Sequence, residues 1–274
     1  GKIHLGNNVK KIFANANSEL LFFKSIFITV KKVKDNRITL NKIRSKEGNK
    51  ILFVISFIDL NNDGNLDAFV CHDVDPNVYY INNGSGILGF NQGGIGDHDE
   101  GGNYGSIWTD YDNDGDQDVV LTSLGGKQLY MFINDGTGKF TEEAVARGVA
   151  MIDDRPHSGM GVSFGDYNND GWLDMHTNEW QPADVSAYAI PSHSRLFKNL
   201  GASGKPGVFV DVTKEAGVEL ESRVDLVYSF SSSFTDFDDD GHLDLAIAMD
   251  FGLSRFYWNN GDGTFTDGTF DAQL

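Results

Sequence analysis

The sequence predicts an all-β protein, a β-propeller made of four-stranded antiparallel blades. Three observations predict this fold: an acidic loop of fixed spacing recurs four times, each copy is followed by a turn rich in Asn and Gly, and short apolar segments lie between. Glycine is abundant, with 32 among 274 residues, and proline is scarce, with five. Many short strands joined by tight turns at a regular spacing are typical of sandwich, barrel and propeller folds.

The first repeated element is the acidic loop Asp-x-(Asp/Asn)-x-Asp-Gly-x-x-Asp, whose residues we number as positions 1 to 9. Its first aspartates are 51, 56 and 70 residues apart. Self-similarity of this kind is the signature of a repeat architecture. The copies, called loops 1 to 4, are residues 59–67, 110–118, 166–174 and 236–244.

The second repeated element is a turn that begins with Asn and has Gly two residues later. Gly and Asn tolerate the positive φ angles that tight turns require. A phenylalanine follows each turn, at Phe90, Phe140, Phe209 and Phe265. The turns begin at Asn82, Asn134, Asn199 and Asn259.

Short segments rich in β-branched and aromatic residues lie between the two elements and favour strands. Each repeat is therefore predicted as strand, acidic loop, strand, turn, strand, Asn-Gly turn and strand, which makes one propeller blade. We expect a repeat region over 51–274 and a separate, atypical segment over 1–50. The blade motifs lie near 53–90, 105–140, 161–209 and 231–265.

The acidic loop has the pattern of a calcium site. Calcium takes about six to eight oxygen ligands, which side chains at positions 1, 3, 5 and 9 and the backbone carbonyl of position 7 can supply. Glycine at position 6 allows the sharp bend. We expect about four Ca²⁺ ions, held by Asp59, Asn61, Asp63, Asn65 and Asp67; by Asp110, Asp112, Asp114, Asp116 and Asp118; by Asp166, Asn168, Asp170, Trp172 and Asp174; and by Asp236, Asp238, Asp240, His242 and Asp244.

Other interpretations of the loop are weaker. An EF-hand needs Glu at position 12, where this sequence has Val70, Leu121, Thr177 and Ile247. Magnesium keeps its waters and rarely takes an all-protein cage, and transition metals usually recruit His or Cys side chains. One such loop alone could be a metal-free hairpin rich in Asx residues, but four copies in register favour calcium.

The charge distribution separates the two regions. The net charge is −18, yet residues 1–50 carry 12 basic and three acidic residues, which leaves −27 for the rest. This acidity argues against nucleic acid and anionic membranes as partners, and no apolar run is long enough to span a bilayer. Whether residues 1–50 supply part of a further blade stays open. The lone cysteine, Cys71, is expected to be a small buried apolar residue rather than a nucleophile.

The loops and turns resemble the FG-GAP/VCBS-type repeats of integrin-α-like propellers, in particular the cartilage acidic protein branch. The resemblance covers about residues 51–270 and is carried best by residues 159–174, 209–218 and 259–266. It implies a propeller with Ca²⁺ in the loops that join the first two strands of each blade, at an extracellular or cell-surface location. Related rings usually have about six to eight blades, so the resemblance also implies a fragment of a larger ring.

Two classes of function follow. The leading hypothesis is a calcium-binding adhesion or recognition module, not an enzyme, which binds a protein or glycan through surface loops at 91–107 and 178–195, the latter with Trp180, Tyr188 and His193. The alternative is a carbohydrate-active enzyme, a lyase or dehydratase, although no Ser-His-Asp order, zinc-protease helix or phosphate loop is present. Its candidate residues are His72, Asp73, Asp97, His98, His157, His176 and Glu179.

Overall fold

The computed structural model describes residues 22–23, 25–26, 52–72, 76–96, 102–124, 129–150, 159–180, 194–220, 228–250 and 252–270. Within the basic segment only β1 (Phe22–Phe23) and β2 (Ser25–Ile26) are described, and they pair antiparallel. Whether segment 1–50 forms part of a blade therefore lies outside the described residues.

Sixteen further strands form four separate sheets of four strands each, and in every sheet consecutive strands pair antiparallel. This confirms the predicted all-β fold of four-stranded antiparallel blades. The sheets are β3 (Leu52–Ile58), β4 (Asp67–His72), β5 (Val78–Asn82) and β6 (Leu88–Gln92); β7 (Gly102–Thr109), β8 (Asp118–Leu124), β9 (Tyr130–Asn134) and β10 (Phe140–Glu142); β11 (Gly159–Gly165), β12 (Asp174–Glu179), β13 (Arg195–Asn199) and β14 (Phe209–Asp211); and β15 (Ser229–Thr235), β16 (Asp244–Met249), β17 (Arg255–Asn259) and β18 (Phe265–Asp267).

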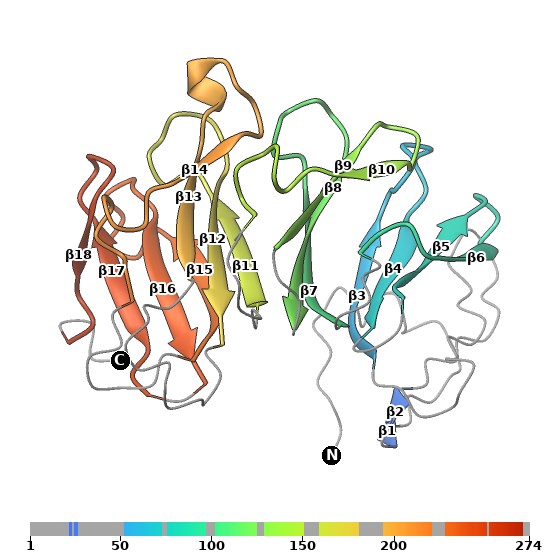
Figure 1. Cartoon of the computed structure of the whole chain (residues 1–274), viewed down its shortest axis with the longest axis horizontal. Helices are drawn as coiled ribbons and strands as arrows, with labels where there is room; N and C mark the ends of the chain where they lie inside the picture. The colour runs from blue at the N-terminus through green and yellow to red at the C-terminus, as the bar shows by residue number, and fades with distance from the viewer. Residues whose placement is uncertain are drawn as a thin grey trace.

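The four sheets stand side by side in chain order, like blades of a propeller (Figure 1). The first strand of each blade contacts the first strand of the next, β3 with β7, β7 with β11 and β11 with β15. No extensive contact joins the described strands of the first and fourth blades. The described residues thus form an arc of four blades.

Two glycines allow the first strands to approach closely. A Cβ atom on Gly105 of β7 would lie 2.9 Å from the Met160 carbonyl oxygen, and one on Gly161 of β11 would lie 2.7 Å from the Phe230 carbonyl oxygen. Neighbouring backbones occupy the space that a side chain would need, so only glycine fits.

The hydrophobic core lies between the blades, and successive residues of a strand point into opposite junctions because the side-chain period is two. In β8, Val119 packs in the junction of blades one and two, and Val120 packs in the junction of blades two and three. Cys71 is fully buried in the first of these junctions, which confirms the predicted burial of the lone cysteine. No helix in the described part of the chain has the length and apolar character needed to cross a bilayer.

Candidate metal centres

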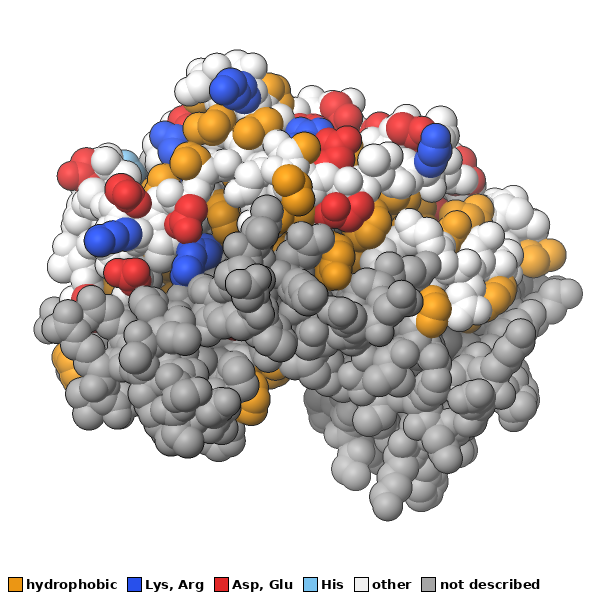
Figure 2. All heavy atoms as spheres, viewed as in Figure 1, with side chains coloured by type: hydrophobic (Ala, Val, Ile, Leu, Met, Phe, Trp, Pro, Cys, Tyr) orange, Lys and Arg blue, Asp and Glu red, His pale blue; other side chains and the backbone are white. Residues whose placement is uncertain are grey.

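The four acidic loops occupy equivalent places in the four blades. Each loop connects the first strand to the second, so loop 2 joins β7 to β8 and loop 4 joins β15 to β16. They lie at one end of the sheets, the upper edge in Figure 1, and acidic side chains are spread over this upper part in Figure 2. Each loop is held at both ends by a pair of hydrogen-bonded strands, which fix the positions of the loop carboxylates.

The position 1 aspartate organises the backbone of every loop. In loop 2, Asp110 Oδ1 accepts the Asp114 N–H at 3.0 Å and Oδ2 accepts the Gly115 N–H at 3.1 Å. The same two bonds recur in the other loops, with donor–acceptor distances from 2.7 to 3.1 Å. The carboxylate at position 1 therefore faces the inside of the turn.

Two left-handed residues give the loop its curvature. Position 4 has φ between 54° and 60°, and the glycine at position 6 has φ between 83° and 98°. Among residues with a side chain, Asn and Asp visit this region most readily. This explains the residues found at position 4, which are Asn62, Asn113, Asn169 and Asp239.

The position 9 aspartate begins the second strand and is almost completely buried in all four loops. One of its oxygens accepts the backbone N–H of the asparagine that starts the following turn, at 2.7 to 2.9 Å. A buried carboxylate needs compensation for lost hydration. The four pairs are Asp67 with Asn82, Asp118 with Asn134, Asp174 with Asn199, and Asp244 with Asn259.

Loop 2 contains buried oxygens that lack protein partners. Asp118 Oδ2 and Asp112 Oδ1 are both buried and neither accepts a hydrogen bond. Burial raises the pKa of Asp118 to about 7, and the loss of hydration also raises that of Asp112. Carboxylate oxygens of Asp110, Asp112 and Asp114 lie within 4.8 Å of one another. The loop gathers negative charge that a cation would neutralise.

The other loops show the same convergence with different ligand sets. In loop 4, oxygens of Asp236, Asp238 and Asp244 lie within 4.8 Å of one another. In loop 3, Asn168 and Asp166 both accept the Asp170 N–H at 3.0 Å, so their oxygens face one place. Loop 1 repeats this pattern, with Asn61 in the role of Asn168.

Loop 3 also contains a buried oxygen without a hydrogen bond, Asp170 Oδ2. The Lys198 ammonium lies 3.7 Å from this atom. Burial raises the pKa of Asp174 in the same loop to about 8. These acidic sites fit a hard cation, because they offer carboxylate and amide oxygens, and a bound ion would compensate the buried ones.

Comparison with known proteins finds a family pattern in three of the four loops. A family model described as an FG-GAP-like repeat matches residues 59–121 and 110–177, which include loops 1, 2 and 3. The chain carries FG-GAP-like repeats. No curated protein matches the sequence.

Two solved structures are similar to this chain. One is an Agrocybe aegerita lectin that recognises non-reducing terminal N-acetylglucosamine, at 19% identity and a TM-score of 0.39 over 77% of this chain and 49% of that chain. The other is the V. cholerae biofilm matrix protein Bap1, at 16% identity and a TM-score of 0.37 over 79% of this chain and 39% of that chain. This chain spans about half or less of each.

The side chain at position 7 of each acidic loop packs against a glycine. The side chain covers the glycine of the following Asn-Gly turn, where an added Cβ would meet it. The Trp172 ring occupies the space beside Gly201, and the His242 ring that beside Gly261. At Trp172 and His242, the candidate metal ligand is therefore the backbone carbonyl and not the side chain, as the sequence predicts.

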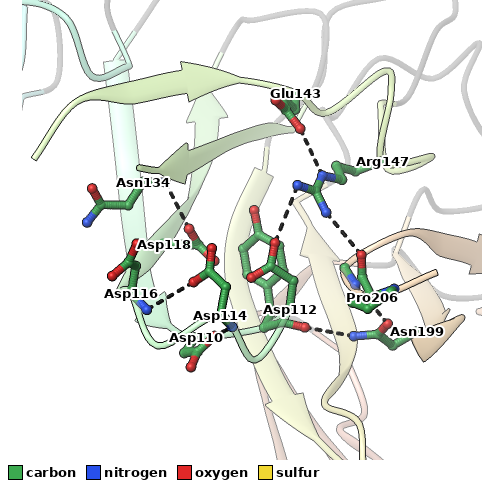
Figure 3. Close-up of polar contacts among 12 residues, drawn as sticks. Asp110, Asp112, Asp114, Asp116, Asp118, Asn134, Glu143, Arg147, Asn199 and Pro206 are labelled. Carbon is green, nitrogen blue, oxygen red and sulfur yellow. Dashed lines mark hydrogen bonds and ion pairs between the residues drawn. The ribbon is translucent and has the colours of Figure 1, made fainter. Parts of the chain in front are cut away.

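Arg147 connects loop 2 to the third blade (Figure 3). Its guanidinium lies 3.4 Å from Asp112 Oδ2, pairs with Glu143 Oε2 at 2.9 Å, and donates to the Pro206 carbonyl at 3.1 Å. Arg147 thus holds one oxygen of Asp112 and leaves the buried Oδ1 available to a cation. Outer partners of this kind fix the orientation of metal-ligating carboxylates.

Sequence reasoning missed two features of these centres. Arg147 gave no signal, because it lies 35 residues from Asp112 in a segment between strands. The asparagines that begin the turns did give a signal, since Asn recurs at that place in all four repeats. We interpreted this recurrence as a turn signal alone, although the side chains of Asn134, Asn199 and Asn259 also bond to the preceding repeat.

The residues of the enzyme hypothesis are dispersed as far as they can be described. His176 and Glu179 are buried in β12, and the His176 ring Nδ1 lies 3.0 Å from Ser232 Oγ inside the junction of blades three and four. Burial lowers the pKa of His176 to about 3. His72 ends β4 in the first blade. The remaining candidates, Asp73, Asp97, His98 and His157, lie outside the described residues.

Proposed function

We propose that this chain is a calcium-stabilised repeat module that acts outside the cell and recognises a protein or glycan ligand. One observation carries the calcium part of the proposal. In loop 2 the buried Asp118 Oδ2 lacks any hydrogen-bond partner, at the end of a loop that already gathers three other carboxylates. An unpaired buried oxygen beside like charges is costly, and a divalent cation supplies the missing partner.

The choice of calcium follows from the donor atoms. Every proposed ligand is an oxygen, from a carboxylate, an amide or a backbone carbonyl, and four side chains with one carbonyl approach the coordination number of calcium. Sites of modest affinity, about 10⁻⁴ to 10⁻³ M, are typical of extracellular modules. The extracellular assignment predicts dissociation constants in that range.

Thermal unfolding with and without calcium tests this proposal. Binding to the folded state contributes about 2.7 kcal/mol per site when the free ion is at 100 times its dissociation constant. We therefore expect EGTA to lower Tm by many degrees, and excess Ca²⁺, but not Mg²⁺, to restore it. An unchanged Tm after complete metal removal would contradict structural calcium.

Asp118→Asn sharpens the test because it removes the buried charge and keeps the shape. The variant is expected to unfold at a higher temperature than the parent in EGTA, since the unpaired charge is gone, and to gain less from Ca²⁺. Glu215→Gln is the matched control, because Glu215 is an exposed acid outside the loops. A larger calcium gain in Asp118→Asn than in the control would contradict the assignment of loop 2.

The recognition part of the proposal is supported at the end of β12. Trp180 is partly exposed, its ring centroid lies 4.8 Å from that of Tyr228, and its Nε1 donates to Asp250 Oδ2 at 3.1 Å. Aromatic rings beside a carboxylate suit the apolar faces and hydroxyls of a sugar or a peptide side chain. Binding to a glycan array by the parent and its loss in Trp180→Ala, with Phe270→Ala as control, would support this site.

A further inference from the structure

In the second, third and fourth blades, the asparagine that begins the Asn-Gly turn bonds to two acidic loops at once. In the fourth blade, the Asn259 N–H donates to Asp244 Oδ1 at 2.9 Å, and its side-chain Nδ2 donates to the Leu243 carbonyl at 2.9 Å. Both acceptors belong to loop 4. The same Nδ2 also donates to the Tyr167 carbonyl, at 2.7 Å, and Tyr167 is position 2 of loop 3 in the preceding blade.

This arrangement repeats at each described junction. Asn134 in the second blade donates to the Leu60 carbonyl of loop 1 at 3.0 Å, and Asn199 in the third blade donates to the Tyr111 carbonyl of loop 2 at 2.9 Å. Asn82 in the first blade makes the bonds within its own blade, to Asp67 and to the Leu66 carbonyl. It makes no bond to another blade's described loop, so it serves as a natural control.

Two of the three junctions contain a second contact between loops. The position 4 side chain of Asn169 in loop 3 donates to the Gly241 carbonyl of loop 4 at 3.0 Å, and it lies 3.1 Å from His242 Nδ1. In the first junction, Asn62 of loop 1 donates to Asp116 Oδ1 of loop 2. Position 7, where Asp116 and His242 stand, carries a proposed carbonyl ligand.

Position 2 lies between two proposed ligands, at positions 1 and 3, so a cation that draws those ligands together also fixes the peptide between them. In loop 4 the N–H of position 2, at Phe237, donates to the position 9 carboxylate of Asp244 at 3.0 Å. The carbonyl of position 2 is the group that the next blade's asparagine holds in loops 1 to 3. The asparagine side chain therefore links the conformation of one loop to the conformation of the next.

We propose that Asn134, Asn199 and Asn259 couple neighbouring loops, so that a cation bound in one loop raises the cation affinity of the adjacent loop. This inference rests on the proposed cation binding. Because the coupling is thermodynamic, it acts in both directions along the arc. These asparagines are positioning residues, since none of them supplies a proposed ligand.

Trp172 provides a reporter for loop 3, because it stands at position 7 of that loop. We would use Tb³⁺ as the probe, a hard cation whose luminescence is sensitised by a nearby indole. Selective excitation of tryptophan in the parent and in Trp172→Phe isolates the loop 3 signal as the difference between them. The titration midpoint of that difference measures the affinity of loop 3.

Two variants in the fourth blade should weaken loop 3. Asn259→Ala removes the bond to the Tyr167 carbonyl, and Asp236→Asn disables loop 4 while Asn259 keeps that bond. Each is expected to raise the loop 3 midpoint about fivefold or more, a typical size for coupling between sites. Asn82→Ala, which removes no bond to another blade's described loop, should leave the midpoint unchanged, and Asp59→Asn, which reaches loop 3 only through loop 2, should raise it less than Asp236→Asn does.

The double variant Asn259→Ala/Asp236→Asn separates coupling through the asparagine from simple charge effects. Coupling predicts a midpoint no higher than that of Asn259→Ala alone, whereas additive shifts would overturn the role of Asn259. A loop 3 midpoint unchanged in Asp236→Asn would overturn coupling and leave cation binding intact. Absence of any Trp172-dependent Tb³⁺ signal in the folded parent would instead overturn the proposed cation binding, and this inference with it.

Discussion

Asn199, the last residue of β13, donates its side-chain Nδ2 to the backbone carbonyl of Tyr111 at 2.9 Å, across the junction between the second and third blades. Tyr111 is 1% exposed, and its ring stacks on Phe164 with centroids 6.3 Å apart. The bond thus satisfies a buried carbonyl of an acidic loop with a group from the next blade. Asn199 therefore contributes both to the packing between blades and to the geometry of loop 2.

The first prediction concerns the stability of this junction. Asn199→Ala leaves the Tyr111 carbonyl buried without a donor, whereas Asn82→Ala removes the equivalent bonds within a blade but none between described blades. An unsatisfied buried polar group costs about 1–3 kcal/mol. We expect Asn199→Ala to lower the free energy of unfolding by about that much more than Asn82→Ala, measured by urea denaturation. Equal losses would show that the bond between blades contributes nothing.

The second prediction concerns Arg147. Its charge would repel a cation, but Glu143 pairs with it at 2.9 Å, so orientation of Asp112 should outweigh repulsion. Loss of an outer partner typically weakens metal binding about 10- to 100-fold. We therefore expect Arg147→Met to weaken calcium binding at loop 2 about 10-fold, measured by the calcium concentration that protects the loop 2 amides from hydrogen exchange.

Glu143→Gln tests whether Glu143 offsets the repulsion between Arg147 and the cation. It leaves Arg147 in place without its neutralising partner, so repulsion should now weaken calcium binding at loop 2 as well. Loop 1, which has no described arginine beside it, is the internal reference in the same exchange experiment. Tighter binding in Arg147→Met would mean that repulsion dominates and that Arg147 opposes the metal.

The third prediction concerns the contact between Trp172 and Gly201. A Cβ atom on Gly201 would overlap the indole ring, and overpacking costs about 1–3 kcal/mol. We expect Gly201→Ala to lower Tm and to shift the tryptophan emission to longer wavelength, because the ring must move toward solvent. Ser203→Ala, an exposed position in the same 3-10 helix η2 (Gly201–Ser203), should change neither.

The fourth prediction concerns Cys71 and pH. Burial raises the pKa of Cys71 to about 12, from an ordinary value of 9.0. The thiolate is the reactive form, so the folded protein should resist alkylation at pH 8 to 9, while the unfolded chain reacts readily. Since the unfolded state releases this proton first, Cys71 contributes a loss of stability as pH rises above about 9. Rapid labelling of the native protein at pH 8 would contradict the junction described here.

The local pattern of the sequence determined the repeats, the strand order within a blade and the candidate ligands of the loops. Glycine, asparagine and aspartate at fixed places dictate left-handed turns, and short continuous runs of apolar residues dictate strands buried on both faces. These are short-range effects of backbone sterics and side-chain period, so they can be predicted without knowing what lies next to each strand.

Only the tertiary structure decided which residues of neighbouring blades contact one another. Arg147 reaches Asp112, and Asn199 reaches Tyr111, because packing of one blade on the next brings together residues that lie 35 and 88 positions apart in the chain. The burial of His176 has the same origin, since its ring Nδ1 lies 3.0 Å from Ser232 Oγ of the next blade. Contacts between blades depend on how far each sheet is rotated and shifted against the next, and no pattern within a single repeat specifies that geometry.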